Sequence, residues 1–179
     1  MPLPRLTFDE LPTAAREAVR PRFERLGYLG EVFSLVGHNE TSLLALLAFA
    51  DNVGASASPE QKEIVALTVS TLNGARAELN QHEQRSLRIG MSSARVAAVE
   101  TLELQHPELD DGDAAIMRLA IATTRSDWSD ARAALYAVVE SFGAEVAVAL
   151  LMQTGYYLMA NAVGHVLDVQ PQVPSIFEE

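Results

Sequence analysis

The sequence contains no cysteine, and Lys62 is its only lysine. The absence of cysteine excludes disulfide bonds, thiolate nucleophiles, thiolate metal ligands and peroxide reduction by a cysteine pair. The scarcity of lysine means that arginine carries nearly all of the positive charge. An arginine close to a candidate site is therefore expected from composition alone, and it is weak evidence for function.

The chain is strongly acidic, with a formal net charge of −11. Nucleic-acid binding needs a basic face, and docking on an anionic membrane surface needs basic residues too, so we expect neither partner. Residues 1–12 contain three prolines and acidic side chains but no apolar stretch of the kind found in signal peptides. A cytoplasmic location is therefore expected.

Helical periodicity and helix-capping residues recur along the chain, which predicts an all-α fold of about seven to nine helices without a sheet. The hydrophobic fraction of 49% can bury the core of one domain, 1–179, with its core at about 13–169. The expected helices span about 13–26, 41–53, 59–73, 75–89, 93–104, 113–124, 129–142 and 144–169.

The two ends of the chain carry specific expectations. Pro21 should delay, kink or split the first helix. Arg16, Arg20 and Arg22 are expected to point outward from it. The segment 170–179 contains two prolines and should run loosely over the surface.

The last predicted helix is long and apolar enough to cross a bilayer. However, it contains Gln153 and Asn161, and the flanking residues Glu145 and Asp168 are acidic. These features favour a helix buried in the core or at a subunit interface. Asn161 and Tyr156 would then need partners, either within the core or as part of a pocket.

The chain is organised around a predicted helical hairpin at residues 58–90. Ser58 is a suitable N-cap, and Gln61 stands three residues later, as a capping box requires. Asn73-Gly74 favours a turn between the two helices. Gly90 is typical of a helix C-terminus.

Three polar side chains of this hairpin are the candidate catalytic residues. Glu78 and His82 are four residues apart and share one helix face. Glu63 and His82 lie at similar distances from the turn, so antiparallel helices would bring them level. Two carboxylates around one imidazole can form a proton relay, because histidine titrates near neutral pH. The alternative is an ordinary solvent-facing Glu–His pair without a function.

The hairpin resembles a segment of the carboxymuconolactone decarboxylase and alkylhydroperoxidase D-like superfamily. That segment reads Ser-Pro, a Glu in the first helix, Asn-Gly, and then Cys-x-x-Cys-x-x-x-His. Glu63 matches the helix Glu and His82 the motif His, whereas the two cysteine positions fall on Ala75 and Glu78. The chain is therefore most similar to the cysteine-free branch, which carries Glu-x-x-x-His and includes the decarboxylase. His38-Asn39-Glu40 and residues 156–161 also read like family segments.

The resemblance implies an enzyme that performs acid–base chemistry without a cofactor, a decarboxylation or a lactone/keto-acid conversion, on a small anionic molecule. His82 would move the proton, and Glu63 and Glu78 would set its tautomer and charge. An anionic substrate would need cationic partners. The cationic side chains nearest in sequence are Arg76, Arg85 and Arg88.

Two alternatives remain open. The first is a binding or scaffold protein that has kept the fold and lost catalysis. The second is a metal-assisted enzyme, although two carboxylates and one histidine are few ligands for a divalent ion. The resemblance also implies a homo-oligomer, a trimer or hexamer, without thiol peroxidase activity.

Overall fold

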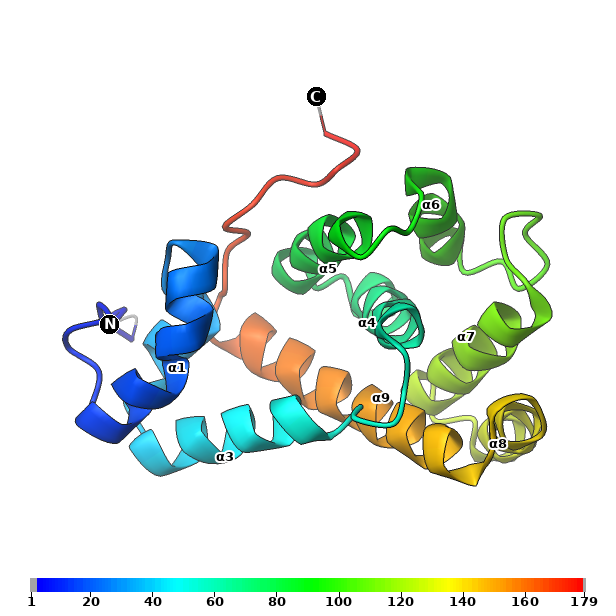
Figure 1. Cartoon of the computed structure of the whole chain (residues 1–179), viewed down its shortest axis with the longest axis horizontal. Coiled ribbons are helices and arrows are strands. Elements are labelled where there is room, and N and C mark those ends of the chain that lie inside the picture. The colour runs from blue at the N-terminus through cyan, green and yellow to red at the C-terminus, as the bar shows by residue number, and fades with distance from the viewer. Residues whose placement is uncertain (1–2, 179) are drawn as a thin grey trace.

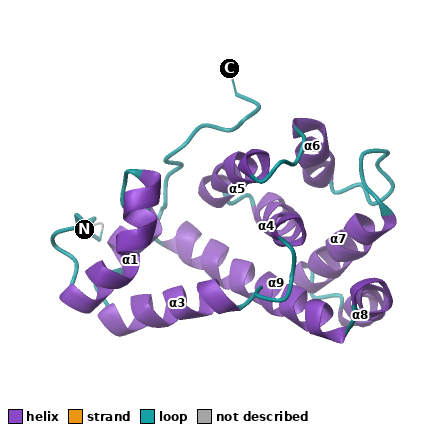
Figure 2. Cartoon of the chain, in the orientation of Figure 1, coloured by secondary structure: helices purple, strands orange, loops and turns teal. Residues whose placement is uncertain are grey.

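The structure is a computed structural model that describes residues 3–178. These residues form nine α-helices and no strand, which confirms the all-α prediction (Figure 2). The helices are α1 (Thr13–Leu26), α2 (Glu31–Val36), α3 (Glu40–Asn52), α4 (Pro59–Asn73), α5 (Arg76–Arg88), α6 (Ser93–Thr101), α7 (Asp111–Thr124), α8 (Trp128–Phe142) and α9 (Ala144–Val166).

Helix α4 is the centre of the molecule. Its residues 63–70 are all buried, and it packs against α5, α6, α7 and α9 (Figure 1). Ser58 and Gln61 form the expected capping box at its start, and Gly74 ends it in the left-handed conformation with φ 63°. Local signals thus set both ends of a helix whose residues 63–70 are buried on every face.

The buried apolar side chains form two hydrophobic cores. The larger one surrounds α4 and is drawn from α4 to α9; its fully buried side chains include Ile64, Leu67, Val99, Ile116, Leu119 and Leu150. The smaller one belongs to α1, α3 and the preceding segment, and it consists of Leu11, Ala15, Val19, Leu43 and Leu47. In Figure 1, α1 and α3 lie at one end of α9, and α7 and α8 lie at the other.

The structure corrects three expectations about the chain ends. Helix α1 continues through Pro21, and Arg22 does not point outward: its side chain is 20% exposed and lines cavities. The C-terminal segment is not loose either. It passes between α1 and α5 (Figure 1), where Ser175 Oγ and Ile176 N donate hydrogen bonds of 2.6 and 2.7 Å to Glu83. We call residues 170–178 the C-terminal strap.

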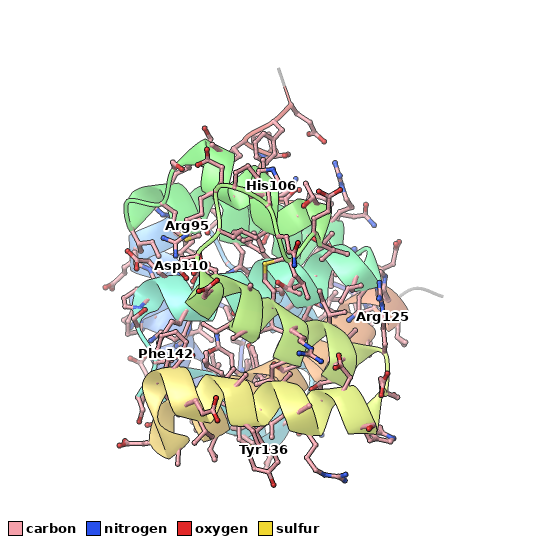
Figure 3. The ribbon with its side chains drawn as sticks, turned by 90° about the vertical axis from the view of Figure 1, so that its right-hand side faces the viewer. Arg95, His106, Asp110, Arg125, Tyr136 and Phe142 are labelled. Carbon is pink, nitrogen blue, oxygen red and sulfur yellow. The ribbon has the colours of Figure 1, made fainter. Side chains whose placement is uncertain are left out.

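The acidic cluster at residues 110–113 begins helix α7. Asp110 and Asp113 form a capping box for α7, and Arg95 donates two hydrogen bonds of 3.0 and 2.7 Å to Asp113. Figure 3 shows Arg95 and Asp110 next to each other at this end of α7. The cluster therefore has a structural explanation.

Helix α9 is the one helix within residues 3–178 that could cross a membrane, judged by length and composition only. Ala147, Leu150 and Tyr157 on this helix belong to the larger core, and α9 packs against α4, α7 and α8. These contacts are those of a core helix.

Candidate functional site

The candidate site is built on a buried contact between the two hairpin helices. Glu63 of α4 is fully buried, and His82 of α5 is 7% exposed. Nδ1 of His82 lies 2.6 Å from Oε2 of Glu63, a short charge-assisted hydrogen bond. The antiparallel packing of α4 and α5 thus brings together two residues that are 19 positions apart in the sequence.

Two further charged side chains of α5 flank this pair. Glu78 lies one turn before His82, with its Oε2 3.6 Å from Nε2, which is a charge contact longer than a hydrogen bond. Arg85 lies one turn after His82, with its Nε 3.1 Å from Oε1 of Glu63. The imidazole therefore has one carboxylate at each nitrogen, one tightly held and one at longer range.

The charges of the pair stabilise each other. Burial alone would lower the pKa of His82, but the charge and hydrogen bond of Glu63, assisted by Glu78, raise this pKa to about 9. Burial would raise the pKa of Glu63, but His82 and Arg85 outweigh that effect and lower it. At neutral pH the pair is consequently an imidazolium and a carboxylate.

Two tyrosines of α9 form the wall beside the imidazole. The Tyr157 ring meets the His82 ring edge to face, with centroids 5.0 Å apart, and Tyr156 packs against Tyr157 in the same way at 5.1 Å. Burial raises the pKa of Tyr156 to about 12 and that of Tyr157 well above its usual value. Both phenols therefore stay neutral near pH 7.

The site opens into a cavity of about 350 Å³ between the N-terminal helices and the α5–α9 side of the larger core. A second hollow of about 530 Å³ adjoins it, and Glu78, His82, Arg85 and Tyr156 line both. Small-molecule sites in proteins have volumes of this size. His82 thus lies in the wall of a space that can hold a small molecule.

The structure places all three predicted site residues close together, although Glu78 is farther from His82 than Glu63 is. Of the three arginines named from the sequence, Arg85 and Arg88 line the cavity. Arg76 instead pairs with Glu178 of the C-terminal strap.

Sequence reasoning missed two cavity residues on α1, Arg22 and Arg25. It expected the first to be solvated and did not single out the second. No local signal marks them, because they lie about 60 positions before His82 in the sequence. Tyr156 was already left open as a pocket residue, and it does line the cavity.

Two further questions from the sequence concern metal binding and the buried Asn161. Among residues 3–178, no three histidine, aspartate or glutamate side chains are arranged to hold a metal ion. The metal-assisted alternative therefore gains no support from the positions of these side chains. Asn161 is buried on α9, with its Nδ2 3.5 Å from Ser70 Oγ, and it lines a separate hollow beside Ala75.

The family model of carboxymuconolactone decarboxylase matches residues 41–124, which include the whole hairpin. The match covers slightly less than half of the chain, and it shows that this region is similar to that family. The resemblance seen in the sequence is thereby confirmed, and the lack of cysteine fits the cysteine-free branch. The sequence has no significant match among curated proteins.

Solved structures of AhpD-like proteins share this fold. A peroxidase-related protein from Ralstonia eutropha JMP134 with an alkylhydroperoxidase AhpD core is 17% identical, at a TM-score of 0.75, over 96% of this chain and 91% of its own. A protein of unknown function from Agrobacterium tumefaciens is 18% identical, at 0.71, over 78% and 96%. A cysteine-to-alanine variant of the debrominase Bmp8, in complex with 2,3,4-tribromopyrrole, is 16% identical, at 0.82, over 95% and 91%. At these identities the likeness shows the fold alone.

Proposed function

We propose that the protein is an enzyme that transfers a proton to or from carbon in a small anionic molecule, without a cofactor, in a decarboxylation or a lactone/keto-acid conversion. The observation that carries the proposal is the buried Glu63–His82 pair in the wall of a cavity. The family match and the fold shared with a debrominase support an enzyme.

The protonation state gives His82 the role of an acid. Its Nδ1 is engaged by Glu63, so Nε2 is the nitrogen that is left to serve the substrate. Because its pKa is raised to about 9, Nε2 carries a proton at neutral pH. An imidazolium beside a bound molecule can protonate a carbanion or enolate as it forms.

In a decarboxylation, the electron pair of the broken carbon–carbon bond would move into a conjugated carbonyl, and carbon dioxide would leave. The Nε2 proton of His82 would then be transferred to the carbon of the resulting enolate. Solvent would return a proton to the imidazole, so the net reaction consumes one proton. Glu63 would remain a carboxylate and stabilise the imidazolium in the resting state.

Glu78 is suited to a different role from Glu63. Its side chain is 26% exposed, compared with 1% for Glu63, and it lies on the Nε2 side of the ring. It can therefore carry protons between solvent and Nε2 after each turnover. The two carboxylates therefore have different roles: Glu63, buried in the core, holds the imidazolium, and Glu78, which faces the cavity, exchanges protons with it.

The test is a turnover screen of small β-keto acids and carboxylated lactones, after a thermal-shift screen for binding. For a substrate that emerges, His82→Gln should lower turnover by about 100-fold or more and retain the helical circular-dichroism spectrum. Glu78→Gln should lower turnover less and keep binding. A ligand that binds but is not converted by the wild-type protein would instead indicate the binding-protein alternative.

We also propose a cytoplasmic homo-oligomer without thiol peroxidase activity. The exposed apolar side chains Val148 and Met152 of α9 support a subunit interface. Native mass spectrometry should give a trimer or hexamer, and a monomer at micromolar concentration would contradict this. Turnover of alkyl hydroperoxides with a dithiol reductant would contradict the absence of peroxidase activity.

A further inference from the structure

The cavity beside His82 is cationic although the protein as a whole is strongly acidic. Its charged lining residues are Arg22, Arg25, Arg85, Arg88, the His82 imidazolium, Glu31 and Glu78. Arginine is charged at every relevant pH, so at neutral pH the lining contains five positive and two negative side chains before partners are counted. The formal charge of the whole chain is −11.

Most of these charges already have a partner. The pairs are Arg22 with Asp51, Arg85 with Glu63, Glu31 with Arg5, and Glu78 with the His82 imidazolium. Arg25 and Arg88 form no salt bridge or side-chain hydrogen bond with any residue between 3 and 178. Two guanidinium groups therefore face the cavity without a counter-charge from the protein.

The rest of the wall is largely apolar. It includes Leu26, Phe33, Leu46, Met159 and Val163, which come from α1, α2, α3 and α9. This apolar part of the wall offers no hydrogen bonds to hydroxyl groups. Of the uncharged polar side chains in the lining, Tyr28, Gln81, Gln170 and Gln172 are already hydrogen-bonded within the protein, so a sugar acid or a second carboxylate would find few free partners. The lining thus suits a ligand that is apolar over most of its surface and charged at one end.

We propose that Arg25 of α1 and Arg88 of α5 bind the carboxylate of an apolar carboxylic acid, whose aryl or alkyl body occupies the cavity next to His82. A guanidinium can bind a carboxylate through two parallel hydrogen bonds. The two arginines come from different helices, α1 and α5, so the carboxylate would be bound from both helical regions.

The reaction of the bound acid rests on the proposed function, whereas its binding by the two arginines does not. Hydrogen bonds from guanidinium groups stabilise a carboxylate in its ionised ground state. The anchored carboxylate is therefore not the group that leaves, and the reacting carbon lies in the body of the molecule, nearer to His82. Of the two reactions proposed above, this arrangement favours the lactone/keto-acid conversion.

The experiment compares three probes by isothermal titration calorimetry: 4-phenylbutyrate, its uncharged amide 4-phenylbutanamide, and the polar anion gluconate. The wild-type protein should bind 4-phenylbutyrate at least about tenfold more tightly than either comparison compound, because only this probe combines the charge with an apolar body. Rising salt should weaken its binding, since ions screen the attraction.

The variant Arg25→Gln combined with Arg88→Gln should lose this preference, so that acid and amide bind equally. Arg125→Gln is the matched control; Figure 3 shows Arg125 at the end of α7, on the α7–α8 side of the molecule, and it lines none of the cavities described above. The control should bind 4-phenylbutyrate as the wild type does. Both arginines of the double variant are exposed, so its thermal unfolding should match that of the control.

Equal binding of acid and amide by the wild type would overturn the proposal, as would unchanged affinity in the double variant or the absence of detectable 4-phenylbutyrate binding. None of these readings depends on turnover. A protein that binds 4-phenylbutyrate through the two arginines but converts no acid would refute the proposed function and leave this site standing. Turnover of an acid that is unaffected in the double variant would refute this binding site and leave the proposed function standing.

Discussion

The two hydrophobic cores differ in size and in what they contribute to the candidate site. The larger core around α4 contains the buried Glu63 and holds His82 between α4 and α9. The smaller core of α1 and α3 contains five buried side chains and contributes Arg22 and Arg25 to the cavity wall. The cavity lies between the two regions.

This difference indicates a division of labour. Proton transfer requires a fixed geometry, and a side chain packed on all sides in a large core cannot change rotamer freely. Ligand binding tolerates adjustment, and a region with few buried contacts opens at a lower free energy than the main core. The acid–base pair therefore lies in the larger core, and the α1 arginines lie in the smaller region.

The largest effect that tests this comparison is expected from Glu63→Ala. The substitution leaves the His82 imidazolium buried without its counter-ion, so the free energy of unfolding should fall by about 3 to 5 kcal/mol. Urea denaturation at pH 7 measures it. Replacing both Glu63 and His82 by leucine should destabilise the protein less than Glu63→Ala alone, because no unpaired charge remains.

The matched control is Glu17→Ala in the smaller region. Glu17 pairs with Arg20 at 2.7 Å on the exposed face of α1. An exposed pair of this kind contributes little to stability, because water and salt screen its charges. If the two alanine substitutions have equal effects, the buried pair is not the strong contact that its geometry indicates.

The next effect concerns pH. The folded-state pKa of His82 is raised from 6.5 to about 9, so its contribution to stability is complete below pH 6.5 and is lost as the pH rises through 9. The free energy of unfolding should fall by roughly 2 to 3 kcal/mol over this range, since one pKa unit corresponds to about 1.4 kcal/mol. Denaturation curves at several pH values check the prediction.

Glu100 acts in the same direction but at lower pH. Burial and the nearby Glu83 raise the pKa of Glu100 from 4.5 to about 7. The free energy of unfolding therefore also falls as the pH rises from 4.5 to 7, and this decline is nearly complete at pH 7. Any decline between pH 7 and 9 is therefore attributable to His82. It should disappear in His82→Gln, and a decline that persists in this variant would contradict the raised pKa.

Much of the fold could be predicted because its signals are local. Ser58, Ser92 and Asp110 cap α4, α6 and α7 through side-chain hydrogen bonds to residues three positions later, and such pairs are visible in the sequence. The position of the C-terminal strap was not predictable. Its contacts with Glu83 join residues more than 90 positions apart, and its prolines gave no indication of a buried anchor.

The candidate site was predictable in part for the same reason. The hairpin geometry brings Glu63 and His82 level, and the family motif names both. Arg22 and Arg25 were missed because α1 is held beside the cavity by the smaller core. The spacing of residues in the sequence does not show where that core lies relative to the hairpin. The wrong expectation for Arg22 arose from treating α1 as an isolated amphipathic helix with one buried face.

The smallest effects are expected from alanine at one glycine in each region. Gly155 lies in the interior of α9, and a Cβ there would meet no atom within 4 Å. Alanine loses less conformational freedom on folding than glycine, so Gly155→Ala should raise the free energy of unfolding by about 0.5 to 1 kcal/mol. Gly37 closes α2 against the smaller core, where a Cβ would lie 2.8 Å from the carbonyl oxygen of Phe33 and against Leu11.

Because Phe33 O is a backbone atom, it cannot move aside as the end of a flexible side chain can. Gly37→Ala should therefore lower the free energy of unfolding by about 1 kcal/mol or slightly more, the opposite sign to Gly155→Ala. Urea denaturation of both variants measures this. If hydrogen exchange also shows that Gly37→Ala loosens α1 and α3 but leaves α4 protected, the two cores open separately. Equal loss of protection in α4 would show that they open as one unit, and the division between a rigid acid–base pair and an adjustable arginine wall would then be wrong.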